Sequence, residues 1–256
     1  MEENLSEETT QRSAAVSAAD MAFLEEMAKA GILYGRKKSK THPRMKRYIF
    51  GTRNSIEIFD LIQTLSAVEK AQEFLEEVVK KGGLVLLVGT QPAAKALVKN
   101  LASKFNFPYV IERWLGGTLT NFKILSQRIS YYLKLKADRE SGVLEKYTKK
   151  ERLDFDREIE KLGINFSGLE NLKKIPEAVI MVDTNVHETA VREANRLNIP
   201  VVALINSDAN PDKIKYPIPA NSSAKTSIEW IFQKFEAAIE KAQSEKSAEP
   251  KTAAKK

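Results

Sequence analysis

Short apolar runs and helically spaced apolar residues alternate along the middle of this chain, as in domains where strands and helices follow one another. Three runs, at 84–88, 178–182 and 201–205, are apolar at every position, as expected of strands covered on both faces. Shorter candidates lie at 109–110 and around Ile218. We therefore predict an α/β fold with a doubly wound, parallel sheet of about five strands.

The helices between these strands are predicted from their own spacing. Apolar residues fall on one face over 60–80, and the glycine pair at 82–83 ends that helix. Residues 89–92 turn into a second helix, with a proline in its first turn. Further helices are expected over 188–196 and about 223–241. The predicted helices are thus placed to cover the sheet.

One segment, 120–166, does not fit the sheet. Its first half spaces apolar residues by three, four and three positions, as in a coiled-coil seam: Phe122, Leu125, Ile129 and Tyr132. The first helix should end near 141–142, and Thr148 followed by Glu151 forms the capping box of a second. Ten basic and eight acidic residues between 128 and 161 are too many for buried helices. We predict an inserted, projecting helical hairpin; the alternative is a helical pair that only caps the sheet.

The polar ends and the hairpin divide the chain. The first residues are polar and acidic, and the last are Ser, Ala, Lys, Glu and Pro with nothing to bury. The expected organisation is a disordered acidic tail over 1–18, an α/β domain over 19–119 and 167–242, a hairpin over 120–166, and a disordered tail over 243–256. A basic extension over 29–53 belongs to the α/β domain.

The positive charge is concentrated in that extension. The chain has a formal charge of +7, yet residues 27–56 contain no carboxylate. They carry nine cations, so the rest of the chain is slightly acidic: Lys29, Arg36, Lys37, Lys38, Lys40, Arg44, Lys46, Arg47 and Arg53. Uncompensated cations favour a polyanion, and a phosphate backbone releases counterions when they bind it. RNA or DNA is the first hypothesis, and a solvated basic loop without a ligand is the alternative.

Residues of this basic loop differ in what they are expected to do. Its cations, together with His42, are the candidate contacts to phosphate, and such contacts carry no base specificity. Tyr34, Tyr48 and Phe50 could stack on bases. Ile49 and Phe50, however, stand where a strand would start, so we expect Phe50 in the core.

A second motif, residues 112–122, lies between the second strand and the hairpin. Gly116 and Gly117 allow a turn that other residues would not tolerate. In a purely structural interpretation, Trp114 fills the base of the hairpin, and Thr118 or Thr120 caps its first helix. In a functional one, this region contacts RNA. The candidate contacts are Arg113, Asn121, Lys123 and Arg128.

Several function classes are disfavoured by composition. The chain has no cysteine and two histidines, so disulfides, thiolate-bound metals and cysteine nucleophiles are excluded, and histidine chemistry has few groups to use. The N-terminus has neither the basic flank nor the apolar run of a signal peptide, and no apolar stretch reaches membrane-spanning length. We expect an intracellular protein that does not enter a membrane.

An enzyme remains the alternative. Ligands of doubly wound sheets bind beyond the carboxyl ends of the strands. This chain offers there Gly89, Thr90, Asp183, Thr184, Asn206, Ser207 and Asp208. No glycine-rich dinucleotide motif, P-loop or G-x-S-x-G elbow accompanies them. A nucleotide- or sugar-phosphate-binding enzyme would bind its ligand near Gly89 and Asp183.

Four motifs give the chain a family resemblance. They are PRMK with YIFG at 43–51, RWLGGTLTNF at 113–122, VDT at 182–184 and YPIP at 216–219. With them, residues 21–241 resemble the family of bacterial small-ribosomal-subunit protein number two. The resemblance implies a flavodoxin-like domain with a protruding hairpin and no enzymatic activity. It also implies a place in the cytoplasmic ribosome, on ribosomal RNA between the head and body of the small subunit.

The resemblance also implies partners and exposes departures. In the family, the N-terminal region and the hairpin contact ribosomal RNA, neighbouring ribosomal proteins lie close, and the large messenger-binding protein number one is recruited. The family's Val-His-Phe-Gly-His run is replaced here by residues 32–36, which contain no histidine. Some members hold a metal near those histidines and two aspartates. Asp183 matches one aspartate, Asn206 replaces the other, and residues 222–223 are serines in place of an acidic pair. We therefore predict no metal, no cofactor and no small-molecule substrate, and the recruitment of protein number one stays open.

Overall fold

The computed structural model describes residues 18–248, with the side chains of 18–20 and 247–248 left aside. Most of the two predicted tails, 1–17 and 249–256, lies outside the described residues. Within the described part, no helix is long and apolar enough to cross a membrane.

The body is a five-stranded parallel sheet, as predicted. Its strands are β4 (Val85–Val88), β5 (Tyr109–Val110), β6 (Ala178–Val182), β7 (Val201–Ile205) and β8 (Tyr216–Pro219). They pair in the order β5-β4-β6-β7-β8, and every pair is parallel. Counted along the chain, this is the order 2-1-3-4-5 of flavodoxin-like domains.

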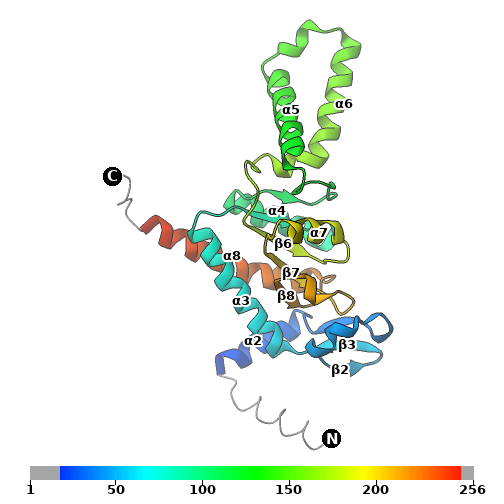
Figure 1. Ribbon diagram of the computed structural model, residues 1–256, viewed down its shortest axis with the longest axis vertical. Coiled ribbons are helices and arrows are strands. Elements are labelled where there is room, and N and C mark those ends of the chain that lie inside the picture. The colour runs from blue at the N-terminus through cyan, green and yellow to red at the C-terminus, as the bar shows by residue number, and fades with distance from the viewer. Residues whose placement is uncertain (1–17, 249–256) are drawn as a thin grey trace, which may run out of the picture.

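Helices cover both faces of this sheet (Figure 1). On one face, α2 (Ala18–Lys29), α3 (Leu61–Lys80), α4 (Pro92–Phe105) and α8 (Lys225–Ala248) share a core with alternate strand residues such as Val85 and Leu87. On the other face, α7 (Glu188–Arg196) and the base of the hairpin pack on Leu86 and Val88. The strands are apolar at every position because successive side chains enter two different cores.

The last helix is longer than the sequence pattern predicted. We expected it to end near residue 241 and a tail to begin at 243, but α8 continues to Ala248. Ala242 is buried, and Lys80 of α3 pairs with Glu245 at 2.7 Å. The prediction of a tail over 243–248 was therefore wrong. Pairing with α3 continues the helix beyond its last apolar residues.

The inserted segment forms the predicted hairpin and extends away from the sheet (Figure 1). Its helices are α5 (Phe122–Glu140) and α6 (Lys149–Phe166), joined through the 3-10 turn η3 (Val143–Lys146). The capping box at Thr148 is confirmed: its backbone N–H donates to Glu151 at 2.9 Å. The buried seam of α5 comprises Leu125, Ile129, Tyr132 and Leu135.

The basic segment is a small sheet, not the loop that we predicted. Strands β1 (Tyr34–Lys37), β2 (Ile49–Arg53) and β3 (Ile56–Phe59) pair antiparallel in the order β1-β3-β2. Two 3-10 turns, η1 (Lys38–Lys40) and η2 (Pro43–Tyr48), connect β1 to β2. We call residues 34–59 the N-terminal sheet. Phe59 on its inner face and Met45 of η2 are buried in the second core.

Candidate nucleic-acid interface

The cations of the N-terminal sheet fall into two groups. Three arginines, Arg36, Arg44 and Arg47, form ion pairs with aspartates of the body of the protein. The other cations of the sheet lie exposed, with no carboxylate within 4.0 Å among the described residues. They are Lys37, Lys38, Lys40, Lys46 and Arg53.

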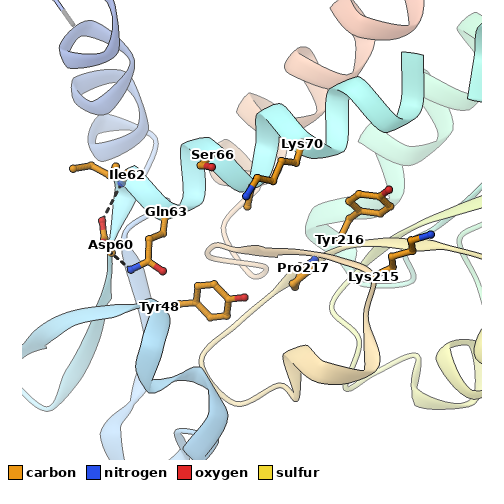
Figure 2. Close-up of a pocket in the computed structure, with 10 residues that line it drawn as sticks. Tyr48, Asp60, Ile62, Gln63, Ser66, Lys70, Lys215, Tyr216 and Pro217 are labelled. Carbon is orange, nitrogen blue, oxygen red and sulfur yellow. Dashed lines mark hydrogen bonds between the residues drawn. The ribbon is translucent and has the colours of Figure 1, made fainter. Parts of the chain in front are cut away.

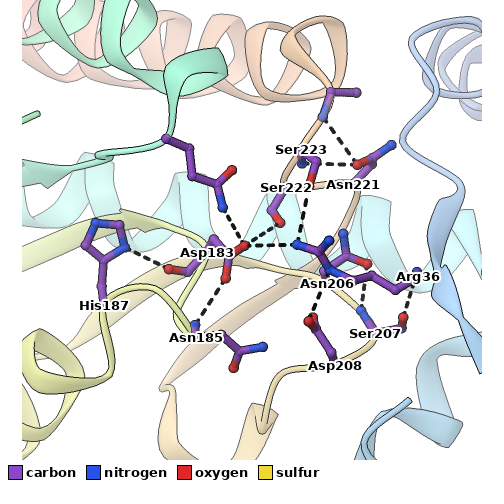
Figure 3. Close-up of polar contacts among 12 residues, drawn as sticks. Arg36, Asp183, Asn185, His187, Asn206, Ser207, Asp208, Asn221, Ser222 and Ser223 are labelled. Atoms are coloured by element: carbon purple, nitrogen blue, oxygen red, sulfur yellow. Dashed lines mark hydrogen bonds and ion pairs between the residues drawn. The ribbon is translucent and has the colours of Figure 1, made fainter. Parts of the chain in front are cut away.

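Arg36 connects β1 to the carboxyl edge of the parallel sheet (Figure 3). Its guanidinium lies 3.6 Å from Asp183, which follows β6, and 3.1 Å from Asp208, which follows β7. Its backbone N–H donates to the hydroxyl of Ser207 at 2.8 Å. Because a planar guanidinium can address two carboxylates at once, Arg36 acts as a clamp between the two sheets.

Asp183 is the buried centre of this edge. Its carboxylate accepts hydrogen bonds from Gln91 at 2.6 Å, Ser222 at 3.1 Å and the backbone N–H of Asn185 at 3.1 Å. Its φ is +64°, a left-handed conformation that few residues other than glycine adopt. Its carbonyl lies 2.8 Å from Nδ1 of His187, a buried ring whose pKa is lowered by burial. The polar atoms of Asp183 are thus engaged by the protein itself.

The residues around Asp183 do not form the metal site that the family resemblance suggests for some members. The Arg36 guanidinium, 3.6 Å from Asp183, already supplies a positive charge to this carboxylate. Asn206 supplies an amide oxygen that accepts from the backbone N–H of Ser207 at 2.8 Å. Within residues 18–248, no group of three or more His, Cys, Asp or Glu side chains is placed to hold a metal ion.

Arg44 and Arg47 fasten the second turn of the N-terminal sheet. Both pair with Asp212 of η5 (Pro211–Lys213), Arg47 at 3.1 Å. His42, predicted as an RNA contact, caps η2 by accepting from the backbone N–H of Arg44 at 3.3 Å. Nothing in the sequence separates these three residues from the neighbouring lysines.

Phe50 lies outside the core, so our prediction for it was wrong. In the β2–β3 pairing, Ile49 stands opposite Phe59 and Gly51 opposite Ile58, which leaves Phe50 as an extra residue in a β-bulge. A bulge redirects the side chain of the extra residue. Ile49 is half-buried against the second core, whereas Phe50 is 74% exposed.

The 113–122 motif wraps around a buried carboxylate that was not predicted from the sequence. Glu193 of α7 accepts from the backbone N–H groups of Gly117 at 2.8 Å, Leu119 at 3.0 Å and Thr120 at 3.2 Å. It also accepts from the indole of Trp114 and the hydroxyl of Thr120, both at 3.1 Å. Burial by itself raises the pKa of Glu193, but these hydrogen bonds outweigh it and hold the pKa below its ordinary value.

The positions of Trp114 and Gly117 agree with the structural interpretation of this motif. Trp114 packs at the base of the hairpin, as the structural interpretation predicted, and Gly117 has a φ of +89°. Neither threonine caps α5: Thr118 donates to the carbonyl of Leu115 at 2.6 Å, Thr120 donates to Glu193, and the N-cap is Asn121. The capping prediction was wrong because Glu193, distant in sequence, competes for the hydroxyl of Thr120.

The four predicted RNA contacts near the hairpin are exposed. Arg113 and Asn121 precede α5, and Lys123 and Arg128 lie on its first turns. None of the three cations has a carboxylate partner within 4.0 Å in the described part of the chain. They are separate in sequence from the N-terminal sheet and flank the base of the hairpin.

Gly89 and Asp183, the residues expected to bind the ligand of the enzyme alternative, leave no room for it. A side chain at Gly89 would meet Val98 at 2.8 Å and Ala94 at 3.2 Å, so this glycine allows α4 to pack closely on β4. Asp183 is enclosed by its protein partners. Neither residue faces a free cradle for phosphate.

A cavity of about 490 Å³ lies elsewhere, between the N-terminal sheet, α3 and β8. Figure 2 shows Tyr48, Lys70 and Tyr216 around it. The only carboxylate in its lining, Asp60, caps α3 by accepting from the backbone N–H of Ile62 at 3.1 Å and is also bound by Gln63 at 2.8 Å. The cavity therefore lacks a free acid–base pair.

Comparison with known proteins places these features in a family. Residues 27–242 match the family model described as ribosomal protein S2. The small ribosomal subunit protein uS2 of Mycobacterium leprae is 40% identical over 216 residues, which cover 84% of this chain and 78% of that protein. The uS2 protein of Dictyoglomus thermophilum is 40% identical over 217 residues, 85% of this chain and 88% of its own. The uS2 protein of Micrococcus luteus is 42% identical over 209 residues, which cover 81% of this chain and 73% of that protein. The chain belongs to the ribosomal protein S2 family, a structural family without enzymatic activity.

Proposed function

We propose that this protein is a structural component of the bacterial small ribosomal subunit, in the cytoplasm, where it binds ribosomal RNA through the N-terminal sheet. One observation carries the proposal: five exposed cations of this small sheet have no carboxylate partner among the described residues. Their mutual repulsion is relieved when phosphates replace the counterions around them. The names of the relatives support the same assignment.

The predicted contacts divide into two roles under this proposal. Lys37, Lys38, Lys40, Lys46 and Arg53 bind phosphate directly. The arginines at 36, 44 and 47, with His42, hold the N-terminal sheet on the body and leave the other five cations exposed. Because phosphate contacts position a protein without reading bases, RNA architecture selects the binding place.

The hairpin supplies a second contact. Arg113, Asn121, Lys123 and Arg128 lie at its base, and its outer part carries mixed charges. We assign the base to ribosomal RNA and the outer part to neighbouring proteins of the small subunit. Recruitment of the large messenger-binding protein number one has less support, because Arg36 stands where the family resemblance leads us to expect a histidine.

Charge reversal separates the two groups of cations. A variant with Lys37, Lys38 and Lys46 changed to Glu should fold normally, since none of the three has a protein carboxylate partner among the described residues. It should fail to enter small subunits when a tagged copy is expressed in cells. The matched control changes the exposed Lys99, Lys173 and Lys225 to Glu, with the same change in net charge, and should enter them. Normal incorporation of the first variant would contradict the proposal.

A further inference from the structure

The outward face of the N-terminal sheet combines aromatic and aliphatic side chains with cations. Register places Tyr34 opposite Ile58, and both Lys37 and Arg53 opposite Ile56, so these side chains share one face. Tyr34 is 49% exposed and Ile56 37% exposed. The opposite face is closed: Glu57 and Phe59 are buried, and Glu57 accepts from Thr52 at 2.8 Å.

Phe50 and Gly51 give this face its shape. The bulge turns the Phe50 ring into solvent, beside the strand position where Gly51 faces outward opposite Ile58. A side chain built at Gly51 would meet nothing within 4 Å beyond its two chain neighbours, and its backbone is not in the left-handed region. Neither packing nor backbone conformation therefore requires glycine here. A strand glycine of this kind leaves room for another group to approach the backbone closely.

The charges near this face select the class of ligand. Lys37, Lys38 and Arg53 are exposed and have no carboxylate partner among the described residues, so a polyanion is favoured. A duplex presents phosphates but hides the faces of its bases, whereas an unpaired strand presents both. An exposed ring beside cations is the combination used to hold single-stranded nucleic acid.

We propose that the outward face of the N-terminal sheet binds unpaired nucleotides of RNA, with a base stacked on Phe50 above Gly51 and the flanking phosphates on Lys37 and Arg53. This inference rests on the proposed function and adds to it a requirement for single-stranded RNA. The bound base occupies the space that the missing side chain of residue 51 leaves open.

Binding of the full-length protein to two RNA probes tests the inference. The probes are a short oligouridine and an RNA duplex with the same number of phosphates. Phe50→Ala should weaken oligouridine binding at least about fivefold, since stacking on one aromatic ring is worth that much or more. It should leave duplex binding unchanged. The control Ile175→Ala removes another exposed apolar side chain, 44% exposed in the loop before β6, and should change neither.

Two further variants guard against misfolding. Gly51→Val adds a side chain that a strand accepts readily, so thermal unfolding should be unchanged while oligouridine binding falls. Phe50→Trp should keep binding, and its added indole fluorescence should be quenched by oligouridine but not by the duplex. Both results depend on a base lying against this face.

The outcomes separate this inference from the proposed function. If Phe50→Ala and Gly51→Val bind oligouridine like the unmodified protein while the Lys37, Lys38 and Lys46 reversal abolishes RNA binding, the stacking site is wrong and the ribosomal assignment stands. Equal losses on oligouridine and duplex would also overturn it. If the unmodified protein binds neither probe in dilute salt, both fail.

Discussion

The hairpin and the N-terminal sheet are both attached to carboxylates of the body, but through different donors. At the hairpin, the body supplies the carboxylate of Glu193, and the 113–122 loop surrounds it with donors, most of them backbone N–H groups. At the N-terminal sheet, the appended part supplies the Arg36 guanidinium, and the body supplies the carboxylates of Asp183 and Asp208.

The difference lies in burial and in what holds each charge. Glu193 is 7% exposed, and its backbone partners cannot rotate away. The Arg36 side chain is 37% exposed, so water weakens its ion pairs. The first attachment should therefore fix the hairpin as part of the folded core. The second should hold the N-terminal sheet more loosely, and the following predictions test that contrast.

Glu193→Gln should have the largest effect. An amide cannot accept at both of its ends, so at least one of the N–H groups at Gly117, Leu119 or Thr120 loses its partner. We expect the free energy of unfolding to fall by about 2–4 kcal/mol, measured by urea denaturation. The control Glu188→Gln lies on the same helix with a 55% exposed side chain and should change stability by less than about 0.5 kcal/mol. Equal effects would refute a special role for the buried carboxylate.

Arg36→Ala should have a smaller global effect and a larger local one. Asp183 stays buried without its cation, but its three hydrogen bonds remain, so we expect a loss of about 1–2 kcal/mol. Amide hydrogen exchange should accelerate in β1 and β3 more than in β4 and β6. Lys37→Ala on the same strand serves as the control and should change neither. Faster exchange throughout the body would instead mean that Arg36 supports the core.

The pH dependence of stability should reveal His187 beside the clamp. Burial lowers the pKa of His187 in the folded state. As pH falls below about 6.5, the unfolded chain binds a proton that the folded protein still excludes, so stability decreases. The stability that the neutral ring contributes is fully present above the pKa of the unfolded state. It is lost as pH falls toward the lower pKa of the folded state. Replacing His187 with Gln should flatten the dependence between pH values of about 6.5 and 5 in urea titrations; an unchanged slope would count against a buried neutral ring.

Ser55→Gly should give the smallest effect, with opposite sign. Asn54 and Ser55 form the tight turn between β2 and β3 with φ values of +50° and +62°. Glycine adopts this conformation without strain, so the variant should be more stable by about 0.5–1 kcal/mol in thermal unfolding. Ser103→Gly, inside α4, is the contrasting control and should be less stable. Destabilisation by Ser55→Gly would mean that the turn is not strained.

Sequence alone predicted the parts of this fold that depend on local periodicity. The strands at 84–88, 178–182 and 201–205 and the capping box at Thr148 were recovered because neighbouring residues determine them. The bulge at Phe50 escaped prediction, since one extra residue in a pairing reverses which side chains face outward. The amino-acid sequence contains no signal for such a shift in strand register.

The sequence predicted which segment carries the candidate interface. It did not predict which of its cations pair with aspartates and which stay exposed. Arg36 and Lys37 are adjacent and equally basic, and only the folded structure shows that one meets Asp183 and Asp208 while the other faces solvent. Glu193 looked like an ordinary helical glutamate, because its partners lie more than seventy residues away in sequence. Contacts between distant segments are the information that periodicity and motif spacing do not carry.

Sedimentation of the tagged, full-length protein with ribosomal subunits shows whether exposed cations hold it on ribosomal RNA. We expect the protein to travel with small subunits in moderate salt and to be released into the free fractions at high salt, since these cations bind phosphates. Large subunits should carry none of it. If the protein stays in the free fractions at every salt concentration, it is not a component of the small subunit.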